Sequence, residues 1–145
     1  MSFFSDNKRE EQLRQVLHSW MGTPYRYFAG VKGAGADCIC FVTSVLEEIG
    51  FGPLKIEKYP RDWHLHNTEE LLFDGIIDAL DVDIIDLKAP ESGDIILFQF
   101  GKTMSHCGFY MDKKIFHAVN GCGVISSEWL DTTWHKRKRC GVRLR

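Results

Sequence analysis

The sequence predicts a single α+β domain over residues 1–145, with N-terminal helices packed on a small antiparallel β-sheet. In the first half of the chain, apolar residues recur at every third or fourth position, as they do in amphipathic helices. After Pro90 the pattern changes to short β-branched and aromatic runs, separated by turns of hairpin length. A chain of this length can bury roughly 70% of its unfolded surface, which is enough for one core.

The first helix is predicted over residues 5–20, where apolar side chains lie on one face and charged side chains on the other. Asp6 is a suitable N-cap, and Gly22 with Pro24 ends the helix. The glycine-rich stretch 22–36 cannot form a long regular element, and its aromatic residues indicate a packed loop.

A second helix is predicted from Cys38 to about Ile49, with Asp37 as its N-cap. Gly50 ends this helix. Its expected buried face consists of five apolar residues: Phe41, Val42, Val45, Leu46 and Ile49.

A third helix is predicted over residues 68–80, with Asn67 or Thr68 as its cap. Five apolar residues are expected to point inward: Leu71, Leu72, Ile76, Ile77 and Leu80. The acidic residues between positions 69 and 94 are expected to form a solvated face.

Three strands are predicted in the second half of the chain, over residues 94–100, 106–111 and 115–119. Residues 124–125 are a candidate fourth strand. Ser126 or Ser127 is expected to cap one helical turn over residues 128–130. The basic tail, residues 135–145, is expected to end in an edge strand over 142–144 that its charges protect from pairing.

Composition and charge exclude several functional classes. The net charge of −2 offers no general attraction to nucleic acid, and no apolar run is long enough to span a membrane. We therefore expect neither a nucleic-acid nor a membrane partner. The charged N-terminus resembles no secretory signal, so we expect cytoplasmic synthesis. The five cysteines form no CxxC pair, so no metal site is predicted and reduced thiols are expected.

Cys38 is a candidate nucleophile, because the start of a helix favours the thiolate form of a cysteine. A nucleophilic thiol needs a base, and the base needs a group that orients it. His106 and His117 lie on neighbouring predicted strands, about 4.8 Å apart across the pairing, although spacing does not settle which one is the base. Trp63 and His64, in the aromatic loop 55–67, are candidates for a wall of the substrate cleft.

Five motifs also resemble those of the NlpC/P60 cysteine peptidases: GTPY at 22–25, ADCICFV at 36–42, PESGDIILF at 90–98, HCGFY at 106–110 and FHA at 116–118. Their order and approximate spacing agree with the family's pattern. YPRDWH at 59–64 and SSEWL at 126–130 are similar to the branch found with phage tails and gene transfer agents. That narrower resemblance implies a virion or tail association, phage tail proteins as partners, and action in the periplasm.

The resemblance implies a papain-like fold and hydrolysis of peptidoglycan stem peptides, typically between D-glutamate and a diamino acid, through a thioester. It assigns Cys38 as the nucleophile, His106 as the base and His117 as the residue that orients the base. Tyr25 is then a hydrogen-bond donor beside the cysteine, and Asp37 is the acidic residue before it. Neither a metal nor an organic cofactor is implied.

The chain departs from the family pattern beside these residues. Where the family usually has DCSGF, Ile39 replaces the serine and Cys40 replaces the glycine. Cys107 follows His106 at a position where valine or alanine is usual. Two alternative functions stay open beside hydrolysis: a cell-wall-binding or tail structural module without catalysis, and a thiol acyltransferase on the same fold. An amine, rather than water, would capture the thioester in the second alternative.

Overall fold

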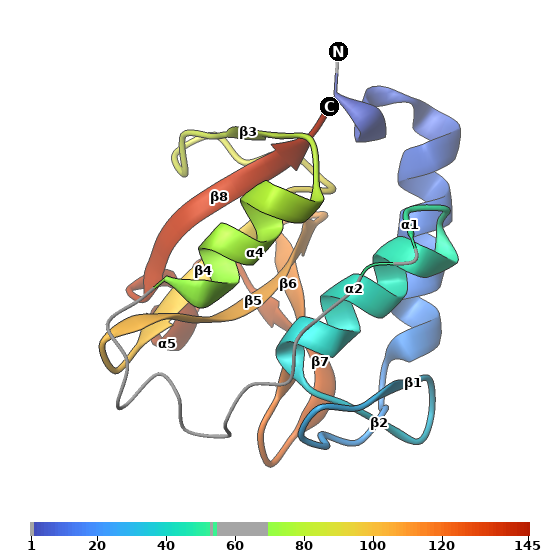
Figure 1. The fold of residues 1–145 in the computed structure, drawn as a ribbon, viewed down its shortest axis with the longest axis vertical. Helices are drawn as coiled ribbons and strands as arrows, with labels where there is room; N and C mark the ends of the chain where they lie inside the picture. Colours follow the sequence, from blue (N-terminus) through green and yellow to red (C-terminus); the bar gives the residue numbers. More distant parts are fainter. Residues whose placement is uncertain (1, 53, 55–69) are drawn as a thin grey trace.

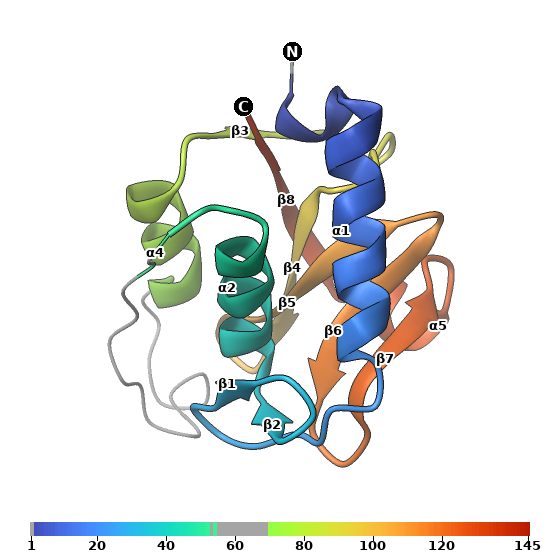
Figure 2. The same ribbon diagram turned by 90° about the vertical axis from the view of Figure 1, so that its right-hand side faces the viewer.

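The computed structural model describes residues 2–52, 54 and 70–145. Within them the predicted α+β class is confirmed: helices α1, α2 and α4 lie along one face of a six-stranded antiparallel sheet (Figures 1 and 2). The helices are η1 (Phe3–Ser5), α1 (Asn7–Trp20), α2 (Cys38–Glu48), α4 (Leu71–Ala79) and α5 (Thr132–His135). The strands are β1 (Gly30–Val31), β2 (Gly35–Ala36), β3 (Val82–Ile84), β4 (Ile95–Phe100), β5 (Thr103–Met111), β6 (Lys114–Val119), β7 (Gly123–Glu128) and β8 (Lys138–Leu144).

The sheet has a separate core on each of its faces. Its strand order is β3-β8-β4-β5-β6-β7, and β1 and β2 form a separate small hairpin within the glycine-rich loop. Between the sheet and the helices lies the larger core, which includes Leu17, Phe41 and Phe109. On the opposite face a smaller cluster forms around Phe98 and Tyr110, covered in part by two tryptophans. In the described part of the chain, no helix has the length and apolar character needed to cross a membrane.

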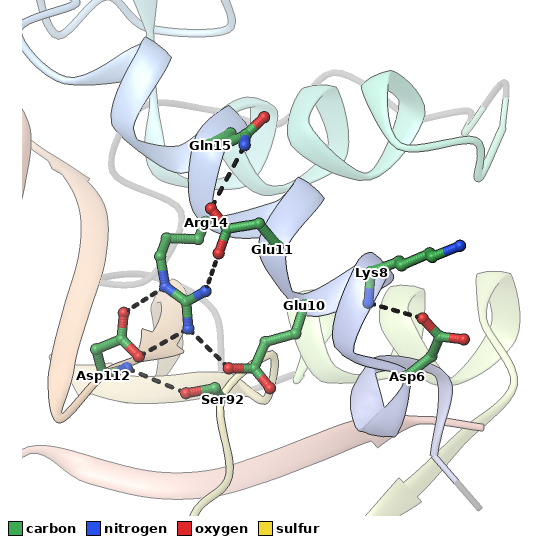
Figure 3. A network of polar contacts seen from close by, with 8 residues as sticks. All are labelled: Asp6, Lys8, Glu10, Glu11, Arg14, Gln15, Ser92 and Asp112. Atoms are coloured by element: carbon green, nitrogen blue, oxygen red, sulfur yellow. Dashed lines mark hydrogen bonds and ion pairs between the residues drawn. The ribbon is translucent and has the colours of Figure 1, made fainter.

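Helix α1 begins where the sequence predicts. The carboxylate of Asp6 accepts hydrogen bonds from the backbone N–H groups of Lys8, at 2.8 Å, and Arg9, at 3.2 Å. Further along, the guanidinium of Arg14 donates to both carboxylate oxygens of Asp112, at 2.7 and 3.0 Å, and also pairs with Glu10 (Figure 3). This network ties α1 to the turn between β5 and β6.

Helix α2 also has the predicted start and buried face. It runs from Cys38 to Glu48, and all five residues of the predicted apolar stripe are buried. The stripe packs against β5 and β6, so the N-terminus of α2 is held close to the middle of the sheet.

The third helix, α4, is shorter than predicted, and part of its predicted buried face is exposed. Leu71 and Ile77 are 41% and 39% exposed, so the prediction that they point inward is wrong. The prediction is confirmed for Leu72, Ile76 and Leu80, which contact the core. Phe73, which is not among the residues predicted to point inward, contacts the core as well. The predicted caps Asn67 and Thr68 lie outside the described residues.

Two predictions about the C-terminal third are wrong. Ser126 and Ser127 do not cap a helical turn, because β7 continues through both serines and pairs with β6 as far as Glu128. The short helix α5 follows later and is capped by Asp131. Strand β8 is not at the edge either: it lies between β3 and β4, and β3 forms the edge.

The basic tail pairs with the acidic segment of the same chain. Arg143 donates to both carboxylate oxygens of Asp94, at 2.8 and 2.9 Å, and Arg145 pairs with Asp81 and Asp83. Asp94 is 1% exposed, so the prediction that the whole acidic segment is solvated is wrong at this position. Its burial follows from its place next to β4, in the middle of the sheet.

Replacing Arg143 by alanine should lower the free energy of unfolding by about 3 kcal/mol, because the buried carboxylate of Asp94 loses its cationic partner. Urea unfolding followed by circular dichroism measures this change. Arg139→Ala is the matched control, since Arg139 is exposed and donates to backbone carbonyls, and its expected effect is within about 0.5 kcal/mol. A loss for Arg143→Ala no larger than that of the control contradicts the prediction.

Candidate active site

Cys38 is the first residue of α2, and its sulfur faces strand β5. The Sγ atom lies 3.6 Å from the carbonyl oxygen of Ser105, and the Sγ atom of Cys107 lies 3.5 Å from the carbonyl oxygen of Cys38. The side chain of Cys38 is 7% exposed, but its surroundings include a carbonyl, a thiol and the imidazole of His106 as well as hydrocarbon.

Strand β5 is irregular at the point where the sulfur meets it. Phe98 of β4 pairs with His106, but the next residue, Gln99, pairs with Met104, so Ser105 is an extra residue in β5. Such a bulge bends a strand and redirects the side chains around it. The bulge places the Ser105 carbonyl and the His106 side chain next to the start of α2.

Two neighbours favour the thiolate form of Cys38. A hydrogen bond from the Cys107 thiol and the hydrogen bond and charge of the His106 imidazole lower its pKa from 9.0 to about 5, although burial acts against them. The same contact and burial raise the pKa of Cys107 well above its usual value, so the two thiols do not ionise together. Cys107 therefore keeps its proton when Cys38 is ionised.

The two predicted histidines are in contact. His106 Nε2 lies 2.8 Å from His117 Nδ1, and His117 Nε2 lies 2.9 Å from the hydroxyl oxygen of Ser127. Because Nε2 of His106 is used in this way, its Nδ1 is the nitrogen that faces Cys38. The four side chains form a continuous polar chain from Cys38 to Ser127.

His117 is the inner member of the pair and is 0% exposed. Burial, together with the charge of His106, lowers its pKa to about 2, so this ring is neutral at physiological pH. His106 is partly exposed and stacks on Trp134, with ring centroids 5.1 Å apart, while Trp134 meets His117 edge-on at 4.5 Å.

Gly108 makes room for the buried histidine. A Cβ atom at this position would lie 2.7 Å from the carbonyl oxygen of Phe116 and 2.9 Å from Cβ of His117. Any larger residue at position 108 would therefore displace the imidazole from His106.

Asp37 joins the glycine-rich loop to α2. One carboxylate oxygen accepts from the Cys40 N–H and the other from the Phe28 N–H, both at 2.8 Å. This confirms Asp37 as the helix cap. Its negative charge opposes ionisation of Cys38, so its part at the site is to hold the helix start in place. Phe28 has a positive φ of 52°, a strained conformation for a bulky residue that this hydrogen bond helps to hold.

For the other predicted site residues, the structure gives a position for Tyr25 only. Tyr25 pairs through its backbone with Ala36, two residues before Cys38, and its ring packs against the core. Its part as a hydrogen-bond donor stays a prediction. Trp63 and His64 lie outside the described residues.

Three residues of the site, Cys107, Ser127 and Trp134, are not among the site residues predicted from the sequence. The sequence shows Cys107 only as an unusual neighbour of His106. Ser127 would have been found if the fourth strand had been extended by two residues, because it then shares a face with His117. Trp134 carries no local signal, since only the fold brings α5 to the histidine pair.

Comparison with known proteins identifies one family over most of the chain. The sequence model of the NlpC/P60 family matches residues 22–143, a range that includes Cys38, both histidines and Ser127. The chain belongs to the NlpC/P60 family. In this NlpC/P60 domain, the thiol of Cys107 touches the candidate nucleophile.

Curated relatives of this NlpC/P60 chain are named as endopeptidases. It is 27% identical over 127 residues to the probable endopeptidase NlpC of Escherichia coli K12, covering 86% of this chain and 71% of the relative. It is 29% identical over 129 residues to the murein DD-endopeptidase MepS/murein LD-carboxypeptidase of the same organism, covering 88% of this chain and 59% of the relative. The chain thus spans 71% of the length of the first protein and 59% of the length of the second.

Solved structures of NlpC/P60 proteins share the fold. A Staphylococcus aureus protein similar to an NLP/P60 lipoprotein superposes with a TM-score of 0.67 at 17% identity, covering 96% of this chain and 42% of that one. RipD of Mycobacterium tuberculosis, a non-catalytic NlpC/p60 domain protein adapted to peptidoglycan binding, superposes with a TM-score of 0.59 at 12% identity. That match covers 94% of this chain and 96% of RipD.

The alkylation rate of Cys38 should rise with pH through about 5 and then level off, because the thiolate is the reactive form. In Cys107→Val, which keeps a side chain of similar size, the midpoint should move to higher pH because the donor to the thiolate is lost. Iodoacetamide labelling with peptide mass spectrometry separates Cys38 from the exposed Cys122. A midpoint near 9 in the unmodified chain, or no change in Cys107→Val, contradicts this prediction.

Proposed function

We propose that this chain is a cysteine peptidase that hydrolyses peptidoglycan stem peptides, at the bond between D-glutamate and the diamino acid. The observation that carries the proposal is the ordered contact from Cys38 to His106 to His117 at the start of α2. A thiol with a lowered pKa, an imidazole beside it and a second group behind that imidazole are the parts that acyl transfer through a thiolate needs.

In the proposed mechanism, Cys38 and His106 form a thiolate–imidazolium pair. The thiolate attacks the amide carbonyl, and the backbone N–H of Cys38, with the hydroxyl of Tyr25, stabilises the developing oxyanion. One such donor commonly contributes about 10²–10³-fold to kcat. His106 Nδ1 then protonates the leaving amine, and the acyl group stays on sulfur as a thioester.

Hydrolysis of the thioester completes the cycle. Nδ1 of neutral His106 takes a proton from water, and the resulting hydroxide attacks the thioester carbonyl. The carboxylic acid leaves and the thiolate of Cys38 is restored next to protonated His106. His117 stays neutral throughout and holds the His106 ring in orientation through the 2.8 Å hydrogen bond.

The endopeptidase and murein names of the relatives support peptidoglycan as the substrate. The bond between D-glutamate and the diamino acid is proposed from the sequence resemblance. The test is to digest purified muropeptides of defined stem sequence and to measure the products by mass. We expect two fragments, one of which gains the mass of water, with cleavage after D-glutamate. Cleavage at another stem position replaces the proposed bond but keeps the reaction class.

A second candidate is a domain that binds peptidoglycan without cleaving it, which the relationship in fold to RipD favours. Retention on insoluble peptidoglycan without any change in muropeptide mass supports this alternative. Products joined to an added amine, in place of water, indicate the acyltransferase. Association with a phage tail stays a prediction from the sequence motifs, and co-purification with tail particles tests it.

A further inference from the structure

The polar chain behind Cys38 continues one residue past the histidine pair. Both ring nitrogens of His117 are hydrogen-bonded, Nδ1 to His106 and Nε2 to the hydroxyl oxygen of Ser127 at 2.9 Å. Ser127 lies on β7, and its strand pairs with β6 so that Ile125 is opposite His117. Ser127 is two residues further along and thus on the same face as the imidazole.

The tautomer of each imidazole in this row of hydrogen bonds depends on which of its two nitrogens must accept a hydrogen bond. A neutral imidazole has one N–H donor and one acceptor nitrogen. When Nε2 of His106 carries a proton, His117 must accept at Nδ1, and its own proton must then be on Nε2. The hydroxyl oxygen of Ser127 is the acceptor placed to receive that proton.

The opposite arrangement would disable the base. If the proton of His117 were on Nδ1, it would be donated to Nε2 of His106, and neutral His106 would carry its own proton on Nδ1. Nδ1 faces Cys38, so the nitrogen that must accept a proton during thioester hydrolysis would already be occupied. A wrong tautomer of this kind costs other triad enzymes about 10⁴-fold in kcat.

Burial makes the choice of tautomer matter. His117 is 0% exposed and is packed against Phe98 and Trp134. A buried N–H group without an acceptor is strongly disfavoured, by a factor of roughly 10 to 100.

We propose that Ser127 is a positioning residue that holds the proton of His117 on Nε2 and thereby keeps Nδ1 of His106 free to act as the base. This proposal rests on the proposed function, since it assigns Ser127 a part in that reaction. In this proposal Ser127 acts through His117, whose Nε2 lies 2.9 Å from its hydroxyl oxygen.

Three variants test the proposal: Ser127→Ala, Ser127→Thr and Ser126→Ala. Ser127→Ala removes the acceptor, while Ser127→Thr keeps a hydroxyl on a residue type that favours strands. Ser126 is the matched control, because it is the neighbouring serine of β7, pairs with Phe116 and points to the other face. Thermal melting of each variant checks that the fold is retained.

Two measurements are needed. With muropeptide substrate, Ser127→Ala should lower kcat about 10- to 100-fold with little change in KM, Ser127→Thr should recover to within about threefold, and Ser126→Ala should match the unmodified chain. Nitrogen-15 NMR of the histidine rings reports the tautomer without any substrate. His117 should show a protonated Nε2 in the unmodified chain and a mixture of tautomers in Ser127→Ala.

An unchanged kcat and an unchanged tautomer in Ser127→Ala would overturn the proposal. So would a well-folded Ser127→Thr that is as slow as Ser127→Ala, because the hydroxyl would then not be the group that matters. If the unmodified chain cleaves no muropeptide, the proposed function fails separately, and the tautomer measurement alone still decides whether Ser127 holds the proton of His117.

Discussion

Replacing Cys38 by alanine should lower the rate of peptidoglycan hydrolysis on the order of 10⁶-fold, to a level that mass spectrometry of muropeptides does not detect. The reason is that no other group near His106 can form the acyl intermediate in the proposed mechanism. Cys107 is the nearest thiol, but its pKa is raised well above the usual value, so it stays protonated. The measurement is product formation from defined muropeptides by the unmodified chain and the variant at equal concentration.

The fold should survive this substitution. Cys38 contributes one sulfur at the edge of the core, and the helix cap is provided by Asp37 rather than by the cysteine. Circular dichroism and the melting temperature should therefore stay close to those of the unmodified chain. Cys122→Ala, at an exposed cysteine, is the control and should retain full activity. Residual hydrolysis at the original rate in Cys38→Ala would show that the nucleophile is another residue.

The second large effect is expected at the histidine pair. His106→Ala should lower kcat about as much as Cys38→Ala, on the order of 10⁶-fold, because both steps pass a proton through its Nδ1. His117→Ala should cost less, on the order of 10⁴-fold, since this ring only orients the base. Single-turnover measurement on muropeptides separates the chemical steps from binding.

The order of the two effects is the informative result. The geometry places His106 against Cys38 and His117 behind it, so a larger loss for His117→Ala than for His106→Ala would mean that base and orienting residue are exchanged. His18→Ala is the control: this histidine is exposed on α1, packs its ring on Phe116 and has no contact with the sulfur. Activity of the control should stay within about twofold of the unmodified chain.

Much of the fold could be predicted because its signals are local. The caps at Asp6 and Asp37, the buried stripe of α2 and the hairpin of β5 and β6 all depend on residues within a few positions of one another. The wrong predictions concern features that depend on segments far apart in the sequence. The face that α4 turns to the core and the internal place of β8, between β3 and β4, depend on neighbours that no periodic pattern identifies.

What the sequence alone determined is a helix that starts at Cys38 and two histidines on adjacent strands. A capping carboxylate and alternating strand residues are sufficient for both, because backbone geometry converts short spacings into faces. Only the tertiary structure decided what surrounds the sulfur. The Cys107 thiol and the Ser105 carbonyl reach Cys38 across 67 to 69 residues of chain, and Ser127 reaches His117 through the pairing of β6 and β7. These contacts depend on strand register and on one bulge in β5, which are set when the whole sheet packs against the helices.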